Sequence, residues 1–572
     1  MDPPLLSGGQ RPRPNYQAVT SAMAAQRVTE APGQPAGDTR SPYKVGDPPD
    51  GTRPTDDDGS LAANPFADPA VAEHYRVVYE KAQYECRHAF EPELEWSRKE
   101  ERGLVRRLDW HVCTWACIMC FALQVDRDNL GQAVSGNMLD QLNLSTNEYN
   151  YGRTIYYISF LLSEVPSQLI SKKFGPDRWI PVQMVLWSVI TCTQAGLTGR
   201  AGFYTTRALL GIFEGGFIPD LVLWLSYFYT SRELPMRLGF FWTANSLTGI
   251  ATSLLAFALL HMDGIKGLAG WRWLFLIEGL VTLSVGLDSF FLMPASAVQT
   301  RTWFRPHGWF TDREERIVVN RVLRDDPSKG DMHNRMPITP RRLWQAVTDY
   351  DLWPLYAMAA VIFIPTNPPE HYLTLTLREL GFDPLNTNLL VIPSTAIGIL
   401  TLLAITWVSE HVDERAFVSM VQGIWSLPCL LALRFWPGTM VDDWGTYALV
   451  TVLLSFPYCQ AIVVGWTSKN SGSVRTRAIS ASVFSMMKQV GSISSSNIYR
   501  EDDKPLYRRG NSVLIGINLL AIGLFLFTKC YYVLRNRWKA RRWDSMSEAE
   551  RKEYLEFTKD QGNKRLDFRF AH

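Results

Sequence analysis

The chain has 572 residues, and its 58 lysine and arginine residues nearly balance its 56 aspartate and glutamate residues. The mean hydropathy of −0.07 is that of an ordinary soluble protein, yet more than half of the charged residues lie in 1–107, 295–350 and 535–572. The two intervening blocks, 108–294 and 351–534, are strongly apolar. This segregation excludes a wholly disordered chain and a disulfide-built secreted domain. The near balance of basic and acidic residues excludes a partner, such as nucleic acid, that is recognised by net charge.

Each apolar block divides into six stretches that are long enough to cross a bilayer, which requires about 20 mostly apolar residues. The sequence therefore predicts an all-α integral membrane protein with twelve transmembrane helices in two six-helix halves. Two halves of similar length, joined by a charged bridge, are typical of a duplicated transporter. The predicted spans are 110–131, 150–170, 180–198, 204–227, 238–260, 273–293, 352–368, 388–409, 416–434, 445–466, 478–498 and 512–534.

The charged regions are expected to lie on one side of the membrane. Residues 1–70 are rich in proline, glycine and aspartate and predict a disordered tail, whereas 71–107 predict helix before the first span. Basic residues gather in the loops on the side of the bridge 295–350 and of the tail 535–572, whereas the loop 132–149 has no lysine or arginine. Because cytoplasmic loops carry an excess of lysine and arginine, we expect both termini and the bridge to face the cytoplasm.

A few ionisable residues remain inside the apolar blocks, where a charge is costly and normally faces a partner or a water-filled path. Arg207 and Glu214 are seven residues apart, which on one helix places them on the same side, about 10 Å from each other. Arginine presents paired donors to an acid group, and a glutamate in a poorly solvated cavity can exchange a proton near neutral pH. A structural ion pair between the first and fourth spans is the alternative. The other candidates are Asp126, Arg127, Asp128, Glu164, Asp220 and Lys488.

Two groups of residues are expected to shape individual spans. Gly211, Gly215 and Gly216 in the fourth span allow close helix contact. The three prolines of 365–369 should break the seventh span, where exposed backbone and Asn367 could meet a ligand and act as a gate. Packing or a simple helix end is the alternative for this second group.

Several motifs, taken together, carry a resemblance to a known family. They are Asp126–Ala133, Glu164–Gln168, Lys172–Trp179, Arg207–Gly215, Gly270–Gly279 and Gly562–Phe570. These motifs are similar to those of the anion:cation symporter branch of the major facilitator superfamily and, within it, of the fungal allantoate permease family. The stretch 364–390 is most similar to the sulfonate and sulfur-anion permeases of that family.

The resemblance implies a major facilitator fold and proton-coupled uptake of a small organic anion, a carboxylate or a sulfonate, by alternating access. We expect a monomer in the plasma membrane whose partners are this anion, protons and the lipid bilayer. The predicted site residues are Asp126 and Glu214 for proton coupling; Arg127, Arg207 and Asn367 for substrate binding; and Gly175, Asp177 and Arg178 for gating on the cytoplasmic side.

Departures from the family pattern leave the substrate open. Gln132 and Gln168 stand where the family usually has asparagine, and Asp220 stands where it usually has glycine. An exporter of a fungal secondary metabolite and a non-transporting nutrient sensor are the alternatives. The sequence shows no nucleophile–base set and no metal cluster, so we expect neither an enzyme nor a cofactor.

Overall fold

The computed structural model describes residues 64–572 with short gaps. The predicted disordered tail covers residues 1–70, and its first 63 residues lie outside this part of the chain. Residues 64–70 are described: Phe66 is 2% exposed, and Asn64 donates to the Pro92 carbonyl at 2.8 Å. Within the described residues the structure is helical, and its β structure is limited to an isolated bridge between Thr302 and Arg305. The gaps are 82–83, 231–232, 304, 331–343, 345–346, 472–473, 559 and 561.

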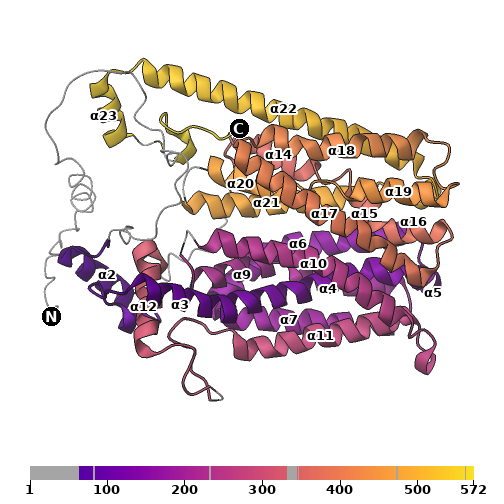
Figure 1. The fold of residues 1–572 in the computed structure, drawn as a ribbon, viewed down its shortest axis with the longest axis horizontal. Coiled ribbons are helices and arrows are strands. Elements are labelled where there is room, and N and C mark those ends of the chain that lie inside the picture. The colour runs from indigo at the N-terminus through magenta and orange to yellow at the C-terminus, as the bar shows by residue number, and fades with distance from the viewer. Residues whose placement is uncertain are drawn as a thin grey trace, which may run out of the picture. The chain divides into compact units, whose positions relative to one another are not determined.

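The first apolar block folds into helices that coincide with its six predicted spans, and these lie side by side in Figure 1. Helix α7 packs on α11, and α6 packs on α8. The helices are α4 (Thr114–Ser135), which continues α3 (Arg98–Leu108) through the turn Asp109–Cys113; α6 (Thr146–Phe174); α7 (Pro176–Thr193); α8 (Arg200–Glu214) followed by α9 (Phe217–Ser226); α10 (Leu234–Leu260); and α11 (Gly270–Leu292).

In the second block α18 packs on α22, as α7 packs on α11 in the first, and α14 packs on α21, as α4 packs on α10. In the described residues of the whole chain, six helical stretches are long and apolar enough to cross a membrane by length and hydropathy. The helices of this block are α14 (Trp353–Val361), α15 (Asn367–His371) and α16 (Leu373–Glu379) in the seventh span; α17 (Pro384–Val412); α18 (Ala416–Phe435); α19 (Asp443–Leu454) with α20 (Gln460–Asn470); α21 (Val474–Ser495); and α22 (Arg508–Asp544).

Three spans are interrupted, and each interruption follows from the local sequence. Between α8 and α9 the backbone turns at Gly216, whose φ of 86° is readily adopted by glycine alone. The seventh span stops at Val361 and resumes at Asn367, just before two prolines, which confirms that the prolines break it. The tenth span opens over 455–459, around Pro457.

One end of the first half carries a helical cap made of α2 (Pro69–Lys81), α3 and α12 (Asp312–Asp325), and we call this end the tail side. Helix α12 begins at a capping box of Thr311 and Glu314. Its Asn320 donates to the Ala89 carbonyl at 2.8 Å and accepts from the Glu91 amide at 2.9 Å. The bridge between the halves is therefore in part an ordered helix that holds the segment before the first span.

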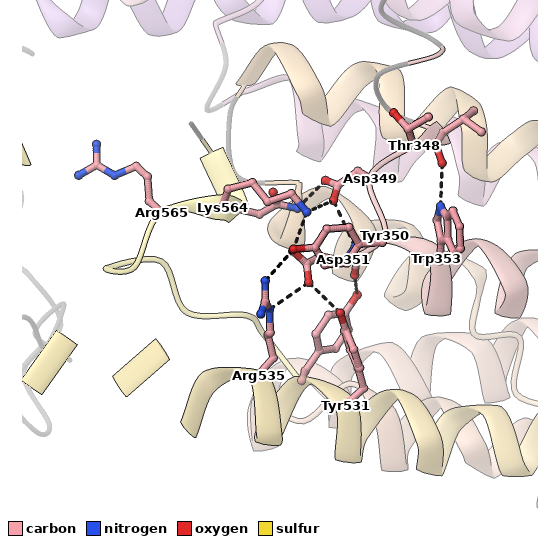
Figure 2. Close-up of polar contacts among 12 residues, drawn as sticks. Thr348, Asp349, Tyr350, Asp351, Trp353, Tyr531, Arg535, Lys564 and Arg565 are labelled. Carbon is pink, nitrogen blue, oxygen red and sulfur yellow. Dashed lines mark hydrogen bonds and ion pairs between the residues drawn. The ribbon is translucent and has the colours of Figure 1, made fainter. Parts of the chain in front are cut away.

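The second half is closed at the same end by the C-terminal segment, residues 562–572, which follows α23 (Glu548–Phe557). Figure 2 shows the polar cluster at its base. The fully buried carboxylate of Asp351 accepts from Lys564 Nζ at 2.7 Å, Arg535 Nε at 3.1 Å and the Tyr531 hydroxyl at 2.8 Å. Lys564 also donates to Asp349 at 2.6 Å. The segment is thereby tied to the start of α14 and to α22.

The contacts within this cluster shift the pKa values of Asp351 and Lys564. Burial alone would raise the pKa of Asp351, but the hydrogen bonds from Lys564 and Tyr531 hold it below its ordinary value. Burial alone would lower the pKa of Lys564, but its bonds to Asp349 and Asp351 raise it. Each charge is stabilised by the other, so the cluster holds best when both are ionised.

Candidate functional site

An ion pair between the first and fourth spans lies at the centre of the candidate site. Arg127 on α4 donates from Nε to Glu214 on α8 at 3.0 Å, and the Tyr156 hydroxyl on α6 donates to the same carboxylate oxygen at 2.6 Å. Glu214 is 1% exposed, whereas Arg127 is 24% exposed and lies 5.2 Å from the centre of the Phe160 ring. The other oxygen of Glu214 is buried and has no hydrogen-bond partner among the described residues. A buried carboxylate therefore binds the Nε side of a partly exposed guanidinium group.

Close packing of α8 on α6 brings Glu214 to Tyr156. A methyl group at Gly211 would overlap the Tyr156 carbonyl oxygen, and one at Gly215 would overlap the Ser163 hydroxyl. Only a residue without a side chain fits at these two places, which confirms the predicted close helix contact.

Arg207 lies on the same helix as Glu214 and is buried, but it does not belong to this ion pair. Its guanidinium donates to the side chain of Gln194, next to α7, and lies 5.7 Å from the Phe203 ring. Arg207 Nε is buried without a hydrogen-bond partner in the described part of the chain. Arg207 therefore lies within the electrostatic reach of Glu214 without pairing with it, because Arg127 takes that position.

Asp126, the neighbour of Arg127, points into the interior of the first half. It is 1% exposed, and neither carboxylate oxygen has a hydrogen-bond partner among the described residues. Trp187, Thr191 and Thr282 face it from α7 and α11. Glu278 on α11 is equally buried, its carboxylate oxygens have no hydrogen-bond partner in the part of the chain that the structure describes, and its charge and that of Asp126 repel each other.

Glu278 is not among the site residues predicted from the sequence, where it entered only as part of the motif Gly270–Gly279. The available signal was a carboxylate in the apolar run Leu276-Ile277-Glu278-Gly279, the same signal that selected Asp126.

One of the ionisable candidates, Lys488, belongs to the second half, and its ammonium group forms hydrogen bonds within the protein. Lys488 on α21 donates to the Tyr458 hydroxyl at 2.9 Å and to Gln460 Oε1 at 2.6 Å, and lies 4.9 Å from the centre of the Phe363 ring. Tyr458 and Gln460 come from the break in the tenth span, so the interruption supplies the lysine's acceptors. Asn367, at the start of α15, donates to Ser495 at 3.3 Å.

The three predicted gating residues lie at the turn between α6 and α7. Gly175 has a φ of 89° and precedes Pro176, which starts α7. Arg178 is 79% exposed and only 4.0 Å from Asp177. Burial raises the pKa of Asp177. The loop is thus formed, and its arginine extends away from the protein surface.

Hydrogen bonds between the two halves close the end opposite the tail side, which we call the far side. Tyr372 donates to Asn150 Oδ1, and Asn150 Nδ2 donates to the Tyr499 carbonyl at 2.6 Å. Further bonds join Thr374 to Gly131, Arg378 to Asp140, Asn388 to Ser135, Thr146 to Glu501 and Asn497 to Thr154. The structure is therefore in a state closed on the far side.

Comparison with known proteins identifies the architecture. The Major Facilitator Superfamily profile matches residues 116–496. "Uncharacterized transporter YIL166C" of Saccharomyces cerevisiae is 45% identical over 520 residues, which cover 91% of this chain and 96% of that protein.

Two solved structures have the same fold. The bacterial homolog of the human lysosomal transporter Spinster, in an inward-facing and occupied conformation, has 15% identity and a TM-score of 0.52 over 74% of this chain and 96% of its own. The xylose transporter XylE from E. coli has 12% identity and a TM-score of 0.54 over 73% and 97%. The predicted all-helical major facilitator fold is confirmed, and the chain belongs to the Major Facilitator Superfamily as a membrane transporter of that type.

Proposed function

We propose that this chain couples the influx of protons to the uptake of a small organic anion, a carboxylate or a sulfonate, by alternating access. In this proposal the transporter is a monomer in the plasma membrane, with both tails in the cytoplasm. The observation that carries the proposal is the ion pair between Arg127 and the buried Glu214.

The pair supports proton coupling because Glu214 and the substrate compete for one arginine. An ionised Glu214 holds Arg127 through Nε, and a protonated Glu214 gives up most of that attraction. The freed guanidinium then offers its paired donors to an incoming acid group. When the anion leaves, Arg127 is again attracted to Glu214, which favours release of the proton. Proton binding and anion binding are thereby linked through one side chain.

Two buried groups extend this linkage. Asp126 has no hydrogen-bond partner in the described residues, and an ionised carboxylate without a partner is strongly disfavoured in a dry interior. It is therefore suited to hold a second proton. Arg207 adds positive charge within electrostatic reach of both Glu214 and Asp126.

The number of protons that enter with each anion decides whether the membrane potential helps to drive uptake. A monovalent anion that enters with one proton is electroneutral, whereas a second proton adds one charge, worth about 2.3 kcal/mol per 100 mV. The resemblance to anion:cation symporters supports coupling but leaves this number to experiment.

The gating loop and Asn367 take roles in the conformational cycle under this proposal. With the far side closed, Arg178 extends into solvent. We expect Gly175, Asp177 and Arg178 to latch the tail side when the far side opens. Asn367 lies at the break of the seventh span, where it can meet the substrate as the span moves.

The test is uptake into liposomes that contain the purified protein. Labelled carboxylates and sulfonates are offered with an inward proton gradient and without one. The proposal predicts gradient-driven accumulation by the wild type and its loss in Glu214→Gln. Glu73→Gln, which alters an exposed pair with Arg76 on α2, serves as the matched control and should behave as the wild type.

Unchanged gradient-driven uptake by Glu214→Gln would contradict the coupling role. The exporter alternative predicts accumulation only when the gradient is reversed. Asp220, the departure that suggested it, accepts from Ser167 at 3.3 Å in the contact between α6 and α9, which accounts for it by packing.

A further inference from the structure

We propose that a groove at the tail-side end of the first span binds an anionic phospholipid of the surrounding bilayer. The phosphate of the lipid lies against Arg106 and Arg102, and one acyl chain lies along Cys113 and Cys117. The inference goes beyond the proposed function, because it concerns a lipid and not the transported anion, and it holds for either direction of transport.

The groove lies beside the junction of α3 and α4 and has a volume of about 380 Å³. Its exposed lining is mostly apolar. Two rows of side chains, each spaced by four residues, place the described lining residues on one face of the continuous helix. They are Arg106, Trp110 and Thr114 in the first row and Asp109, Cys113 and Cys117 in the second. The inner end of the groove therefore has small side chains, and the outer end carries an arginine.

Exposed tryptophans mark the level of the membrane surface at this end. Trp110 is 74% exposed, and Trp353, which begins α14, is 58% exposed. Tryptophan is enriched where membrane and water meet. A helix rises 1.5 Å per residue, so Arg106 lies about 6 Å outward of Trp110 and Cys117 about 10 Å inward. Because the headgroup layer is about 5–8 Å thick, the groove runs from the lipid phosphates into the hydrocarbon.

The charges at the groove favour an anion. Asp109 is the one acid among the described lining residues, and Arg237 on α10 neutralises it by donating from Nε and Nη2 at 2.9 Å each. Arg106 and Arg102, one turn apart on α3, are exposed, and no described residue binds either guanidinium group. The paired donors of arginine match a phosphate.

The combination selects an anionic phospholipid over other phosphates. A soluble phosphate would meet the arginines but leave the apolar part of the groove empty. Phosphatidylcholine would fill the apolar part but bring a quaternary ammonium group near two arginines. In the proposed orientation the tail side faces the cytoplasmic leaflet, which is the anionic one.

The test is native mass spectrometry of the purified full chain in detergent. The protein is titrated with phosphatidylserine and, separately, with phosphatidylcholine. Glycerophosphoserine, which is the headgroup without acyl chains, is added as a competitor. We expect phosphatidylserine to bind about fivefold or more tightly than phosphatidylcholine, and glycerophosphoserine not to displace it.

Variants separate the two ends of the groove. Arg106→Gln should weaken binding of phosphatidylserine about fivefold, and the double variant with Arg102→Gln about 30-fold, since each basic residue near an anionic surface contributes about a factor of five. Thr114→Phe fills the apolar part without changing the charge and should weaken binding about tenfold, the contribution of roughly two buried methylene groups. Arg541→Gln removes an exposed arginine from the end of α22, outside the groove, and should bind as the wild type.

The outcomes are decisive whether or not the proposed function holds, because no transported substrate is needed. Equal binding by the wild type and the double arginine variant overturns the inference. So does a loss in the arginine variants without one in Thr114→Phe, or an equal loss in Arg541→Gln, because either result indicates general attraction to a basic surface. Displacement by glycerophosphoserine assigns the groove to a soluble phosphate. Size-exclusion profiles show which variants fold, and Thr114→Leu replaces Thr114→Phe if that variant does not.

Discussion

Replacing Asp351 by asparagine tests how the C-terminal segment is held. The substitution removes the negative charge that Lys564 and Arg535 share (Figure 2) while keeping the size of the side chain. Removing one member of a fully buried ion pair costs about 3–5 kcal/mol. Here Lys564 and Arg535 are 32% and 22% exposed and regain water, so we expect a cost of about 2 kcal/mol.

Trypsin measures this loss directly, because it can cleave after Lys564 only when the segment detaches. When opening is fast relative to cleavage, the rate follows the population of the open form, so a cost of 2 kcal/mol corresponds to about 30-fold faster cleavage. Asp567→Asn is the control, since Asp567 forms an exposed pair with Arg565 that contributes about 0–1 kcal/mol. Equal cleavage rates in the two variants would refute the reasoning.

The same cluster predicts a pH window. The pKa of Asp351 lies below its ordinary value of 3.8, so its contribution is complete above that pH and is lost as the pH falls through the folded value. The pKa of Lys564 lies above its ordinary value of 10.5, so its contribution is complete below that pH and is lost as the pH rises through the folded value. The difference in cleavage rate between wild type and Asp351→Asn should therefore stay constant between these limits and shrink outside them.

Two further predictions concern the membrane part of the molecule. Gly211→Val should lower the melting temperature in detergent, because overpacking against the Tyr156 carbonyl costs about 1–3 kcal/mol; Gly103→Ala, at a helical glycine with open space around it, should leave the melting temperature unchanged or raise it. A melting temperature for Gly211→Val equal to that of the wild type would show that α8 can move away from α6. Asn150→Ala removes the bonds to Tyr372 and the Tyr499 carbonyl and should raise the labelling rate of a cysteine placed beneath the far-side closure. An unchanged labelling rate would mean that these bonds do not keep the far side closed.

The membrane-spanning helices of this chain could be predicted because each is specified by its local sequence. Apolar length determined where the spans run, and the prolines of 365–369 determined where the seventh span breaks. The ordered bridge helix α12 was not predicted, because its buried face is covered by α3 and by the turn Arg87–Ala89, which are remote in the sequence.

The site was only partly predictable, for the same reason. Seven-residue spacing placed Arg207 and Glu214 on one helix, but only the fold reveals that Arg127 takes the carboxylate and that Gln194 takes Arg207. Lys488 could not be assigned from the sequence, since its acceptors come from the break in the tenth span. The energetic cost of a charge in the bilayer identifies the ionisable residues as candidates from the sequence. The partner of each one depends on packing between segments that are remote in the sequence.

The most direct test of the central claim is to follow protons and substrate together. Liposomes containing the protein and a trapped pH-sensitive dye receive a transported anion at equal pH on both sides. The account predicts that the lumen acidifies as the anion enters, and that Glu214→Gln, folded and still able to exchange labelled anion, gives no acidification. Anion uptake by the wild type without acidification, or acidification that persists in Glu214→Gln, would contradict it.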